Sequence, residues 1–510
     1  MSRRAVRQVS TRRDLTANFL GNAWTALVQL AFVPVYIHLL GIEAYGLIGI
    51  YGVLQLATAI LDLGFTPTMN REAAAALSGG QDPDRARDLL RTVECVLLVL
   101  AAGIFAVGWI AAPWIVDRWL KVEHVDPASA ANALRVMGAM IAARLFMGAH
   151  RGALVGAQRF VWFNAATAAF ATARGVGVLP ILWRWPTPEA FFAWQLAVTV
   201  VEVATVRSKA WSLLPGTRPH AFSFGELRRV RRFAGGVALT TLAMILLGQA
   251  DKVLLAGSLP LVSFGYYALA GAVAGALGLL VTPLGAVAFP RLSACAARGD
   301  RAEAARTFHE FARLTVLAVT PAGFVLCAFA RESLYAWTGD GSLTLAAAPL
   351  VALLAVGTTL NAWLHLPFQV TLASGRSDAT AAFAFVALAV YVPLLVAGME
   401  AHGALGAAEA WVAVNAIALA AALVLPLPSL GWKDRGRWLV RDTLVPAAAA
   451  LAAVAVVRWV VSTDLPAERW TALATVAFAA LISYAAAALA SGSTLRHLRL
   501  VLSGLTAPAK

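Results

Sequence analysis

The stretch NFLGNAWTALVQLAFVPVYIHLLGIEAYGLIGIYGVLQLATAILDLGFTPTMNRE, residues 18–72, sets the class of the whole chain. Two apolar runs, each close to the ~20 residues that a bilayer requires, flank a short turn at Gly41-Ile42-Glu43. At about 100° per residue, the polar side chains of the first run lie within about 60° of one another: Asn18, Asn22, Thr25, Gln29 and Tyr36. The second run carries a similar stripe: Tyr51, Gln55, Thr58 and Asp62. Because hydrocarbon cannot hydrogen-bond these groups, the pattern predicts a membrane hairpin that lines a hydrated cavity.

Composition supports a membrane protein throughout. Of the 510 residues, 60% are hydrophobic and 13% are charged, whereas soluble domains are about 45–50% apolar and about 25% charged. The three cysteines are widely spaced, a pattern that suggests neither a disulfide framework nor a metal site. The first apolar run lacks an Ala-x-Ala cleavage pattern, so we expect a retained helix.

The hydrophobic segments predict an all-α polytopic membrane protein with about fourteen transmembrane helices. Each segment is close to the length of a bilayer crossing. The expected spans are 18–40, 45–65, 92–113, 131–153, 160–182, 189–207, 233–256, 263–288, 311–330, 343–370, 379–398, 404–427, 442–461 and 470–490.

The lysines and arginines predict the orientation of these spans. With both termini cytoplasmic, the inner connections hold 31 Lys and Arg and the outer ones hold 6, as the positive-inside rule requires. The net charge of +14 is therefore a signal of topology, and we expect no nucleic-acid partner. The inner loop 208–232 ends in Arg228, Arg229, Arg231 and Arg232, which favours contact with anionic membrane lipid; recruitment of a substrate is the alternative.

An internal repeat divides the chain into two halves. Leu40–Gly46 (LGIEAYG) is followed 219 residues later by Leu259–Gly265 (LPLVSFG), and Arg71 and Arg291 keep nearly the same offset. Two six-helix bundles of the same orientation, that is, parallel repeats, suit a transporter with its site between them. The predicted domains are a basic tail (1–17), an N-terminal bundle (18–207), a basic linker (208–232), a C-terminal bundle (233–430) and two additional helices with a cytoplasmic tail (431–510).

Two arginines lie inside predicted spans, Arg144 in the fourth and Arg174 in the fifth. An ionised Arg near the bilayer centre costs ~2.5–3.5 kcal/mol even on a lenient scale, so neither should face lipid. One interpretation is a structural pair with an acid such as Glu94 or Glu202. The other is a cationic wall for phosphate or carboxylate, which the guanidinium fork suits.

Three further groups are candidates for a gate or for coupling. Asp251 and Lys252 are adjacent near the outer end of the seventh span, where a gate or ion pair competes with a role in binding a coupling ion or substrate. Asp62 lies at the inner end of the second span, where pairing with Arg71 is the structural alternative. Pro34 in the first span is expected to permit bending.

A second polar stripe lies in the tenth span, where Asn361, His365 and Gln369 recur every four residues. They are candidates for the wall of the cavity. His365 has the chemistry to carry protons near neutral pH, although a lone histidine is also a common packing residue.

Enzyme motifs are missing from the sequence. It contains no G-x-x-x-x-G-K-[ST] loop for ATP and no H-E-x-x-H metal motif. We therefore expect a transporter without catalytic residues, cofactor or metal.

The first hairpin resembles the start of Wzx-type polysaccharide flippases, in the multidrug/oligosaccharidyl-lipid/polysaccharide exporter superfamily. The resemblance lies in Asn18, Asn22, Pro34, Leu40-Gly41, Tyr45-Gly46, Leu61-Asp62-Leu63-Gly64 and Asn70-Arg71. Gln249-x-Asp251-Lys252, Gly257 and Phe264-Gly265-Tyr266 resemble the seventh and eighth helices of that family. The resemblance covers roughly residues 14–430.

This resemblance implies two six-helix bundles around a central cavity that opens alternately to the two sides. It implies translocation of an undecaprenyl-pyrophosphate-linked oligosaccharide from the cytoplasmic to the periplasmic face of the cell inner membrane, for lipopolysaccharide (O-antigen) assembly. The partners implied are that glycan, membrane lipid, and a polysaccharide polymerase and ligase. The role of Arg144 and Arg174 rests on their place in the spans, since no family motif matches them.

Two alternatives remain open. A cation-coupled multidrug exporter of the same superfamily should present acidic cavity residues, whereas the membrane-centred charges here are mainly Arg. A membrane enzyme of glycan assembly, such as a polymerase or ligase, is disfavoured by the short outer loops and the repeat.

Overall fold

The structure, a computed structural model, describes residues 21–77, 83–214, 222–425, 427, 430–461 and 468–491. Regular structure in these residues is helical, apart from one isolated bridge between Lys121 and Pro260. The predicted all-α polytopic class is confirmed. Asn18 and the tails 1–17 and 492–510 lie outside the described residues.

Twelve of the described helices are long and apolar enough to cross a membrane, and two further apolar helices, Ile42–Leu54 and Leu261–Gly275, are shorter. The seventh predicted span, 233–256, falls within the helix Phe224–Ser258, which is not among the twelve. The total of fourteen therefore stays a prediction.

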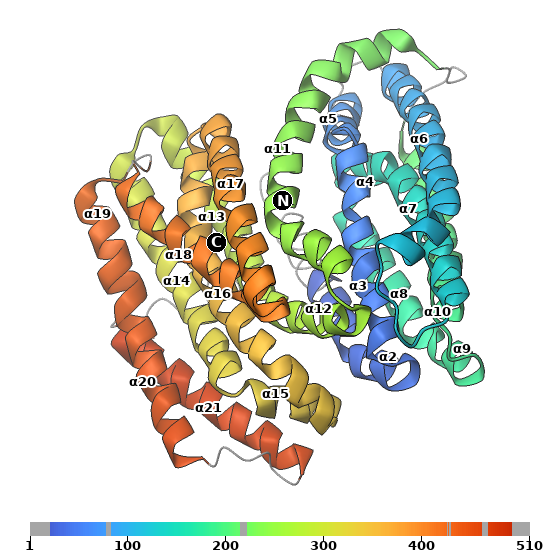
Figure 1. Cartoon of the computed structure of the whole chain (residues 1–510). Helices are drawn as coiled ribbons and strands as arrows, with labels where there is room; N and C mark the ends of the chain where they lie inside the picture. The colour runs from blue at the N-terminus through green and yellow to red at the C-terminus, as the bar shows by residue number, and fades with distance from the viewer. Residues whose placement is uncertain are drawn as a thin grey trace. The chain divides into compact units, whose positions relative to one another are not determined.

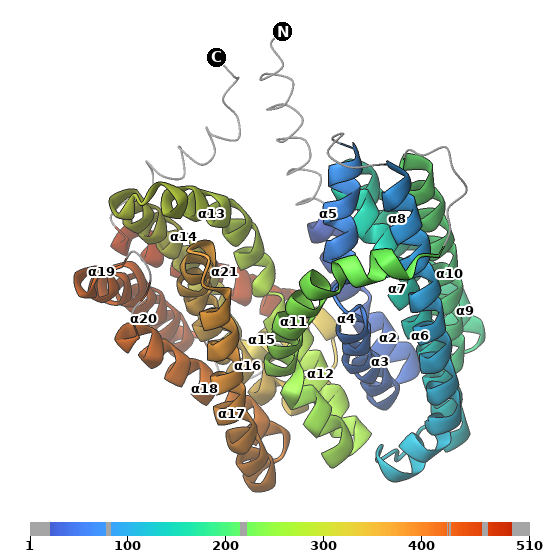
Figure 2. The same cartoon turned by 90° about the horizontal axis from the view of Figure 1, so that it is seen from above.

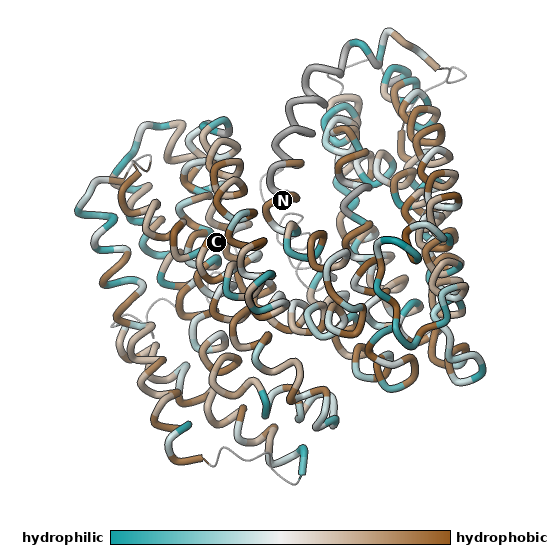
Figure 3. Tube along the Cα trace, viewed as in Figure 1, coloured by the Kyte–Doolittle hydropathy of each residue, from teal (hydrophilic) through white to brown (hydrophobic). Residues whose placement is uncertain are grey.

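The described helices expose large apolar side chains along their length. Ile110 is 78% exposed, Trp459 87% and Leu489 82%. Such surfaces are unfavourable in water and are natural against lipid tails. Figure 3 shows the corresponding brown stretches on the helices of both parts of the chain.

The chain forms two compact units, Met1–Gly265 and Tyr266–Lys510. The first described helix of unit 1 runs Gly21–Leu40 and includes α2 (Val33–Leu40). Unit 1 continues with α3 (Ile42–Leu54), α4 (Leu56–Leu61), α5 (Phe65–Leu77), α6 (Pro83–Arg118), α7 (Pro127–Gly156), α8 (Phe160–Gly177), α9 (Leu179–Arg184), α10 (Pro188–Leu213) and α11 (Phe224–Ser258).

Helix α12 (Leu261–Gly275) carries the boundary between the units, whereas the sequence suggested a boundary within 208–232. The predicted domain limits stay a prediction. Unit 2 contains α13 (Gly278–Arg298), α14 (Arg301–Ala328), α15 (Ala330–Thr338), α16 (Gly341–Ala373), α17 (Ser377–His402), α18 (Ala404–Val424), α19 (Trp432–Arg437), a π-helix (Trp438–Leu444), α20 (Val445–Val460) and α21 (Arg469–Ala490) (Figures 1 and 2).

The helices of the first hairpin are interrupted at several points. Its first helix is interrupted at Phe32, and Pro34 lies in the first turn of α2 that follows. Gly41, at the predicted turn, has φ +84°, a conformation that costs glycine little. The second span breaks at Gln55 and again at Leu63-Gly64, where both residues have positive φ (+49° and +73°).

Helix starts repeat along the chain. α3 and α12 begin at Ile42 and Leu261, 219 residues apart. The starts of α6 and α14, of α8 and α17, and of α10 and α18 differ by 218, 217 and 216 residues. The break between α3 and α4 also has a counterpart in the break between α12 and α13. The repeat seen in the short sequence match therefore extends over the architecture of both halves.

The two matched turns touch each other reciprocally within unit 1. A Cβ on Gly46 would meet the carbonyl oxygen of Leu261 at 2.8 Å, and a Cβ on Gly265 would meet the carbonyl oxygen of Ile42. Gly46 matches Gly265 in the repeat, and Ile42 matches Leu261. Two-fold related surfaces make contacts of this reciprocal kind, which explains glycine at both places.

A buried carboxylate joins three helices of unit 1. Glu94 of α6 receives hydrogen bonds from His150 of α7 (2.7 Å) and from Arg207 and Trp211 of α10 (2.8 Å each). Arg91 adds an ion pair at 3.1 Å. A buried charge supplied with this many donors fixes the packing of the helices that supply them.

The last two helices are attached to the rest of unit 2 by polar contacts. Glu332 of α15, 2% exposed, pairs with Arg458 of α20. The Tyr484 hydroxyl of α21 donates to the carbonyl of Ala318 in α14 at 2.7 Å. His309 of α14 bonds Asp442 of the π-helix at 2.5 Å. α20 and α21 are therefore an integral part of this unit.

Candidate functional site

Three helices of unit 1 bring together what we call the arginine cluster: Arg144 of α7, Arg174 of α8 and Glu202 of α10. α10 packs against both α7 and α8. Arg144 lies within electrostatic range of Arg174. The two arginines that the sequence singled out are thus neighbours in space.

Arg174 is paired. Its Nη2 donates to Glu202 and lies 3.5 Å from the hydroxyl of Thr199. The side chains of Arg174 and Glu202 are only 16% and 8% exposed. Of the two acids that the sequence offered as partners, Glu202 is the one used, while Glu94 belongs to the separate buried network described above.

Arg144 differs from its neighbour. No hydrogen bond or ion pair joins its side chain to any residue in the described part of the chain, and its Nε is buried. The Nε of Arg174 is likewise buried without a partner among the described residues. Buried donors are nearly always satisfied in folded proteins, so two such N–H groups in one cluster call for an explanation.

The charge of the cluster is not balanced. The arginine cluster contains two guanidinium groups and one carboxylate, which pairs with Arg174, so its formal net charge is +1. An anion with several oxygens would supply both the missing charge and the acceptors for the two Nε–H groups.

The hairpin stripes divide into exposed and packed residues. Asn22 and Gln29 are exposed on the first helix, and Gln55 is partly buried where α3 ends. The aromatic members pack instead: Tyr36 meets Phe191 and Tyr51 meets Phe192 edge to face, at 5.1 and 5.9 Å. Tyr36 is buried in the interior of unit 1, whereas Tyr51 is partly exposed and lies within electrostatic range of Arg174, so its place in the cavity wall stays a prediction.

Asp62 has a local structural role. Its carboxylate accepts from the backbone N–H of Thr66 (3.0 Å) and from the Thr66 hydroxyl (2.6 Å), just before and within the first turn of α5. It also approaches Gly148 of α7, where a Cβ would lie 2.8 Å from Oδ1. Asp62 does not pair with Arg71, which bonds Glu72 at 2.8 Å. The expected Asp62–Arg71 pair was wrong because Asp62 caps the helix that carries Arg71.

The polar stripe of α16 is tied to its neighbours in unit 2. Asn361 donates to Asn415 of α18 at 2.8 Å. The His365 and Gln369 side chains meet at 3.3 Å, and His365 packs against Gly285 of α13. The stripe is uncharged except for whatever proton His365 carries, so it offers hydrogen bonds without a fixed charge.

The side chain of Lys252 in α11 forms a hydrogen bond with a residue other than Asp251. Its Nζ donates to Gln249 Oε1 one turn earlier, at 2.8 Å. Both Asp251 and Lys252 are partly buried. The roles proposed for them as gate or coupling residues stay predictions.

The structural roles of three buried carboxylates were not predicted from the sequence. Glu43 is 5% exposed and accepts three backbone N–H groups, of Glu123, His124 and Val125. Glu332 and Asp442 join helices of unit 2. The only hint in the sequence was that each of these acids lies near the end of a predicted span. Many acids in that position are simply exposed to solvent, so the hint did not single these three out.

The matched sequence pattern decides the family. The family described as polysaccharide biosynthesis protein matches residues 11–295, more than half of the chain. The chain belongs to this family. The resemblance to the polysaccharide flippase group, predicted from the hairpin and from the seventh and eighth helices, is confirmed.

One curated relative aligns with most of this chain. A protein of Shigella flexneri named "Putative O-antigen transporter" is 22% identical over 395 residues, which are 77% of this chain and 92% of the relative. The name of this relative agrees with the assignment to the polysaccharide flippase group.

Solved structures share the fold. The lipid II flippase MurJ, in an inward closed conformation, matches with a TM-score of 0.70 and 12% identity over 97% of this chain and 99% of its own. A multidrug resistance MATE family transporter, inward-facing, matches with a TM-score of 0.64 and 16% identity over 82% of this chain and 95% of its own. The difference in coverage is close to the share of the chain that follows residue 430.

Proposed function

We propose that this protein is a flippase that carries a polyprenyl-pyrophosphate-linked oligosaccharide from the cytoplasmic to the periplasmic face of the inner membrane. The observation that carries the proposal is the arginine cluster. It holds two buried Nε–H donors without partners in the described chain and one unbalanced positive charge, in a family of polysaccharide biosynthesis proteins.

The chemistry of such a substrate fits the distribution of polar groups. Its phosphates need cations and several donors, which the arginine cluster provides. Its sugars need groups that both donate and accept, such as the amides of Asn22, Gln29, Gln55, Asn361 and Gln369. The polyprenyl chain stays in lipid, so only the headgroup needs a polar path.

Arg174 and Arg144 take different parts in the proposed binding. Glu202 occupies one end of the Arg174 guanidinium and holds its orientation, while the buried Nε–H of Arg174, which has no partner in the described chain, would donate to an oxygen of the headgroup once the transport cycle opens the cluster. Arg144 has no competing acid in the described chain and provides the unbalanced charge. An alternating-access cycle then exposes the bound headgroup to each side in turn.

The arginine cluster does not suit the multidrug exporter alternative. An organic cation is stabilised by a carboxylate in the binding region, and the carboxylate of the arginine cluster is already neutralised by Arg174. The surplus charge of that cluster has the wrong sign for a cationic drug. This observation favours an anionic substrate.

The function is proposed as transport without catalysis. We place both termini in the cytoplasm, as the charge distribution predicts. A polysaccharide polymerase and a ligase are the proteins that would use the product on the other face.

A deletion strain tests the class of function. Loss of the protein should cause lipid-linked oligosaccharide to accumulate on the inner face, measured by its inaccessibility to a glycosidase added outside spheroplasts. Re-expression of the full chain should restore accessibility. If the intermediate reaches the outer face normally without the protein, the flippase proposal is wrong; a change in drug susceptibility alone would favour the exporter.

A further inference from the structure

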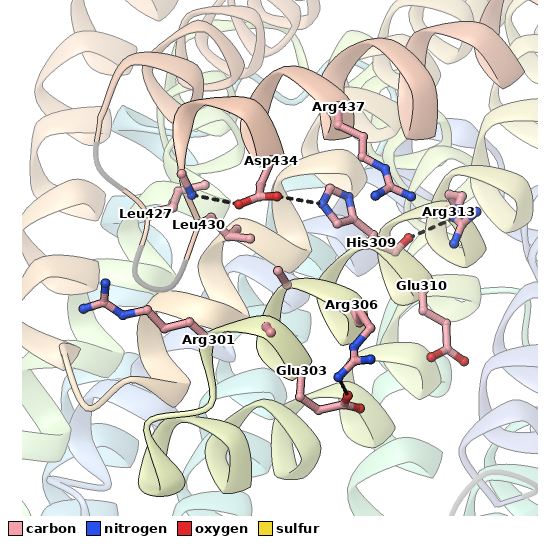
Figure 4. Close-up of a pocket in the computed structure, with 13 residues that line it drawn as sticks. Arg301, Glu303, Arg306, His309, Glu310, Arg313, Leu427, Leu430, Asp434 and Arg437 are labelled. Carbon is pink, nitrogen blue, oxygen red and sulfur yellow. Dashed lines mark hydrogen bonds and ion pairs between the residues drawn. The ribbon is translucent and has the colours of Figure 1, made fainter.

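A cavity lies in unit 2 away from the candidate residues of transport. Its volume is about 1020 Å³, and its walls are the first turns of α14 and the short helix α19 with the residues that precede it. Figure 4 shows Asp434 and Arg437 of α19 facing His309 and Arg313 of α14. The arginine distribution places this end of α14 at the cytoplasmic boundary of the membrane.

The charges around this cavity nearly balance, with a small positive excess. Four arginines (301, 306, 313 and 437) and three carboxylates (303, 310 and 434) line it, so the net charge is +1 with His309 neutral. Arg306 pairs with Glu303 at 2.8 Å, and Arg313 lies 3.5 Å from Asp442. Arg301 and Arg437 are exposed and make no ion pair or side-chain hydrogen bond within the described chain.

His309 gives an independent indication of a ligand. It is 4% exposed, yet it lines the cavity, and its Nε2 has no hydrogen-bond partner among the described residues. Its other nitrogen is fixed by Asp442 at 2.5 Å, so the ring is held in place. Asp434 lies 3.7 Å from Nε2, beyond hydrogen-bond distance. A polar group in the cavity can complete this site.

The wall formed by α19 is rigid and borders an apolar surface. Arg435, 4% exposed, donates to three carbonyls at the end of α18, those of Leu423, Val424 and Leu425. Its guanidinium also lies 4.0 Å from the centre of the Trp432 ring, which is 68% exposed. Exposed tryptophan is enriched where a protein meets the membrane interface.

We propose that this cavity binds the phosphodiester headgroup of an anionic phospholipid from the cytoplasmic leaflet. Basic pockets between membrane helices on the cytoplasmic side are suited to such headgroups. The guanidinium groups of Arg301 and Arg437 supply positive charge and hydrogen-bond donors to the headgroup from opposite ends of the cavity (Figure 4). The carboxylates of Glu310 and Asp434 accept hydrogen bonds from hydroxyl groups of the head.

The number of arginines without an ion pair selects among phosphate ligands. A phosphodiester carries one negative charge, and Arg301 and Arg437 are the two lining arginines that make no ion pair in the described chain. A pyrophosphate carries more negative charge and would meet three carboxylates without enough free arginines. The site is therefore assigned to a structural lipid of the bilayer, and this assignment does not depend on the proposed transport function.

The test uses the purified full-length protein in detergent and native mass spectrometry with added phosphatidylglycerol or phosphatidylcholine. Wild type should retain phosphatidylglycerol at least tenfold better than phosphatidylcholine. The double variant Arg301→Ala/Arg437→Ala should lose this preference. The control Arg331→Ala/Arg376→Ala removes the same charge from two exposed positions outside the cavity and should keep it.

Two further measurements decide among the outcomes. Arg301→Lys/Arg437→Lys should retain part of the preference, because charge persists without the fork. Equal retention of phosphatidylglycerol by the wild type and the alanine double variant overturns the proposal. Inorganic phosphate that stabilises the wild type against heat, with no effect of phosphatidylglycerol, also overturns it and assigns the cavity to a free anion.

Discussion

The two halves of the repeat carry different side chains at matched positions of their helices. Counted from the ends of α7 (Gly156) and α16 (Ala373), 217 residues apart, Arg144 corresponds to Asn361. Arg144 has no partner in the described chain and its Nε is buried, whereas Asn361 is bonded to Asn415 at 2.8 Å. At the same offset Arg174 corresponds to Tyr391, a fully buried ring packed on Trp411. One architecture therefore carries charge in unit 1 and a satisfied amide in unit 2.

This difference teaches where specificity can reside in a duplicated fold. The repeat sets helix starts and breaks, which packing requires in both units. At these two matched positions the charged residues, Arg144 and Arg174, both lie in unit 1, and a buried charge is costly unless it is used. We therefore expect changes at Arg144 to affect transport far more than changes at Asn361.

The largest effect is expected from reversing the charge in unit 1. Arg144→Glu gives the arginine cluster a net negative charge, so headgroup phosphate is repelled while Arg174 gains a second acid nearby. Export should fall on the order of 100-fold or more, since hydrogen bonds to charged groups contribute ~1.5–3 kcal/mol and repulsion adds to their loss. The measurement is surface polysaccharide per unit of protein in the membrane.

Arg135→Glu is the matched control, on the same helix and with the same change of charge. Arg135 bonds Asn132 and stacks on Trp109 and is not part of the arginine cluster. Near-normal export is expected for this variant. Equal losses in both variants would mean that charge anywhere on α7 matters, and the comparison with Asn361 would lose its meaning.

The second prediction separates stability from transport at Arg174. Arg174→Ala leaves Glu202 buried without its partner, which costs ~3–5 kcal/mol and should lower the thermal unfolding midpoint. Arg174→Gln/Glu202→Gln removes both charges and should keep the midpoint near that of wild type while export falls about tenfold. Normal export in this double variant would show that Arg174 is purely structural.

A third, smaller effect is expected when charge is kept and geometry is changed. Arg144→Lys retains the positive charge but loses the planar fork, so export should fall several-fold and remain well above that of Arg144→Glu. The readout is the initial rate of polysaccharide appearance at the surface. Export equal to that of Arg144→Glu would mean that charge contributes nothing.

The smallest effect belongs to unit 2. Asn361→Ala removes one neutral hydrogen bond, worth ~0.5–1.5 kcal/mol, and Asn415 still donates to the carbonyl of Trp411. Export should fall about threefold at most, in the same assay. A loss as large as that of Arg144→Glu would place the critical contact in unit 2.

The sequence was a good guide to the fold because hydropathy, turns and charge act locally. The turn at Gly41, the interruption of the helix before Pro34 and the repeat were all predictable from short patterns. The break at Gln55 was not predictable, since apolar residues continue on both sides of it. The positive φ of Leu63 belongs to a non-glycine residue and carries no compositional signal.

The candidate site was predictable only in part. A charge inside a span pointed to Arg144 and Arg174, and their partner Glu202 was among the acids considered. Helical phase misplaced Tyr36, because the helix is interrupted at Phe32 and because an aromatic ring can pack while its hydroxyl stays polar. Contacts between distant helices, such as His309 with Asp442, have no pattern in the sequence.

Direct binding of the headgroup tests the central claim most closely. Full-length protein in nanodiscs would be titrated with undecaprenyl pyrophosphate and with undecaprenol, which lacks phosphate, for wild type, Arg144→Ala and Arg135→Ala. Wild type and Arg135→Ala should bind the pyrophosphate at least tenfold more tightly than the alcohol, and Arg144→Ala should lose most of that difference. An unchanged preference in Arg144→Ala would contradict the account.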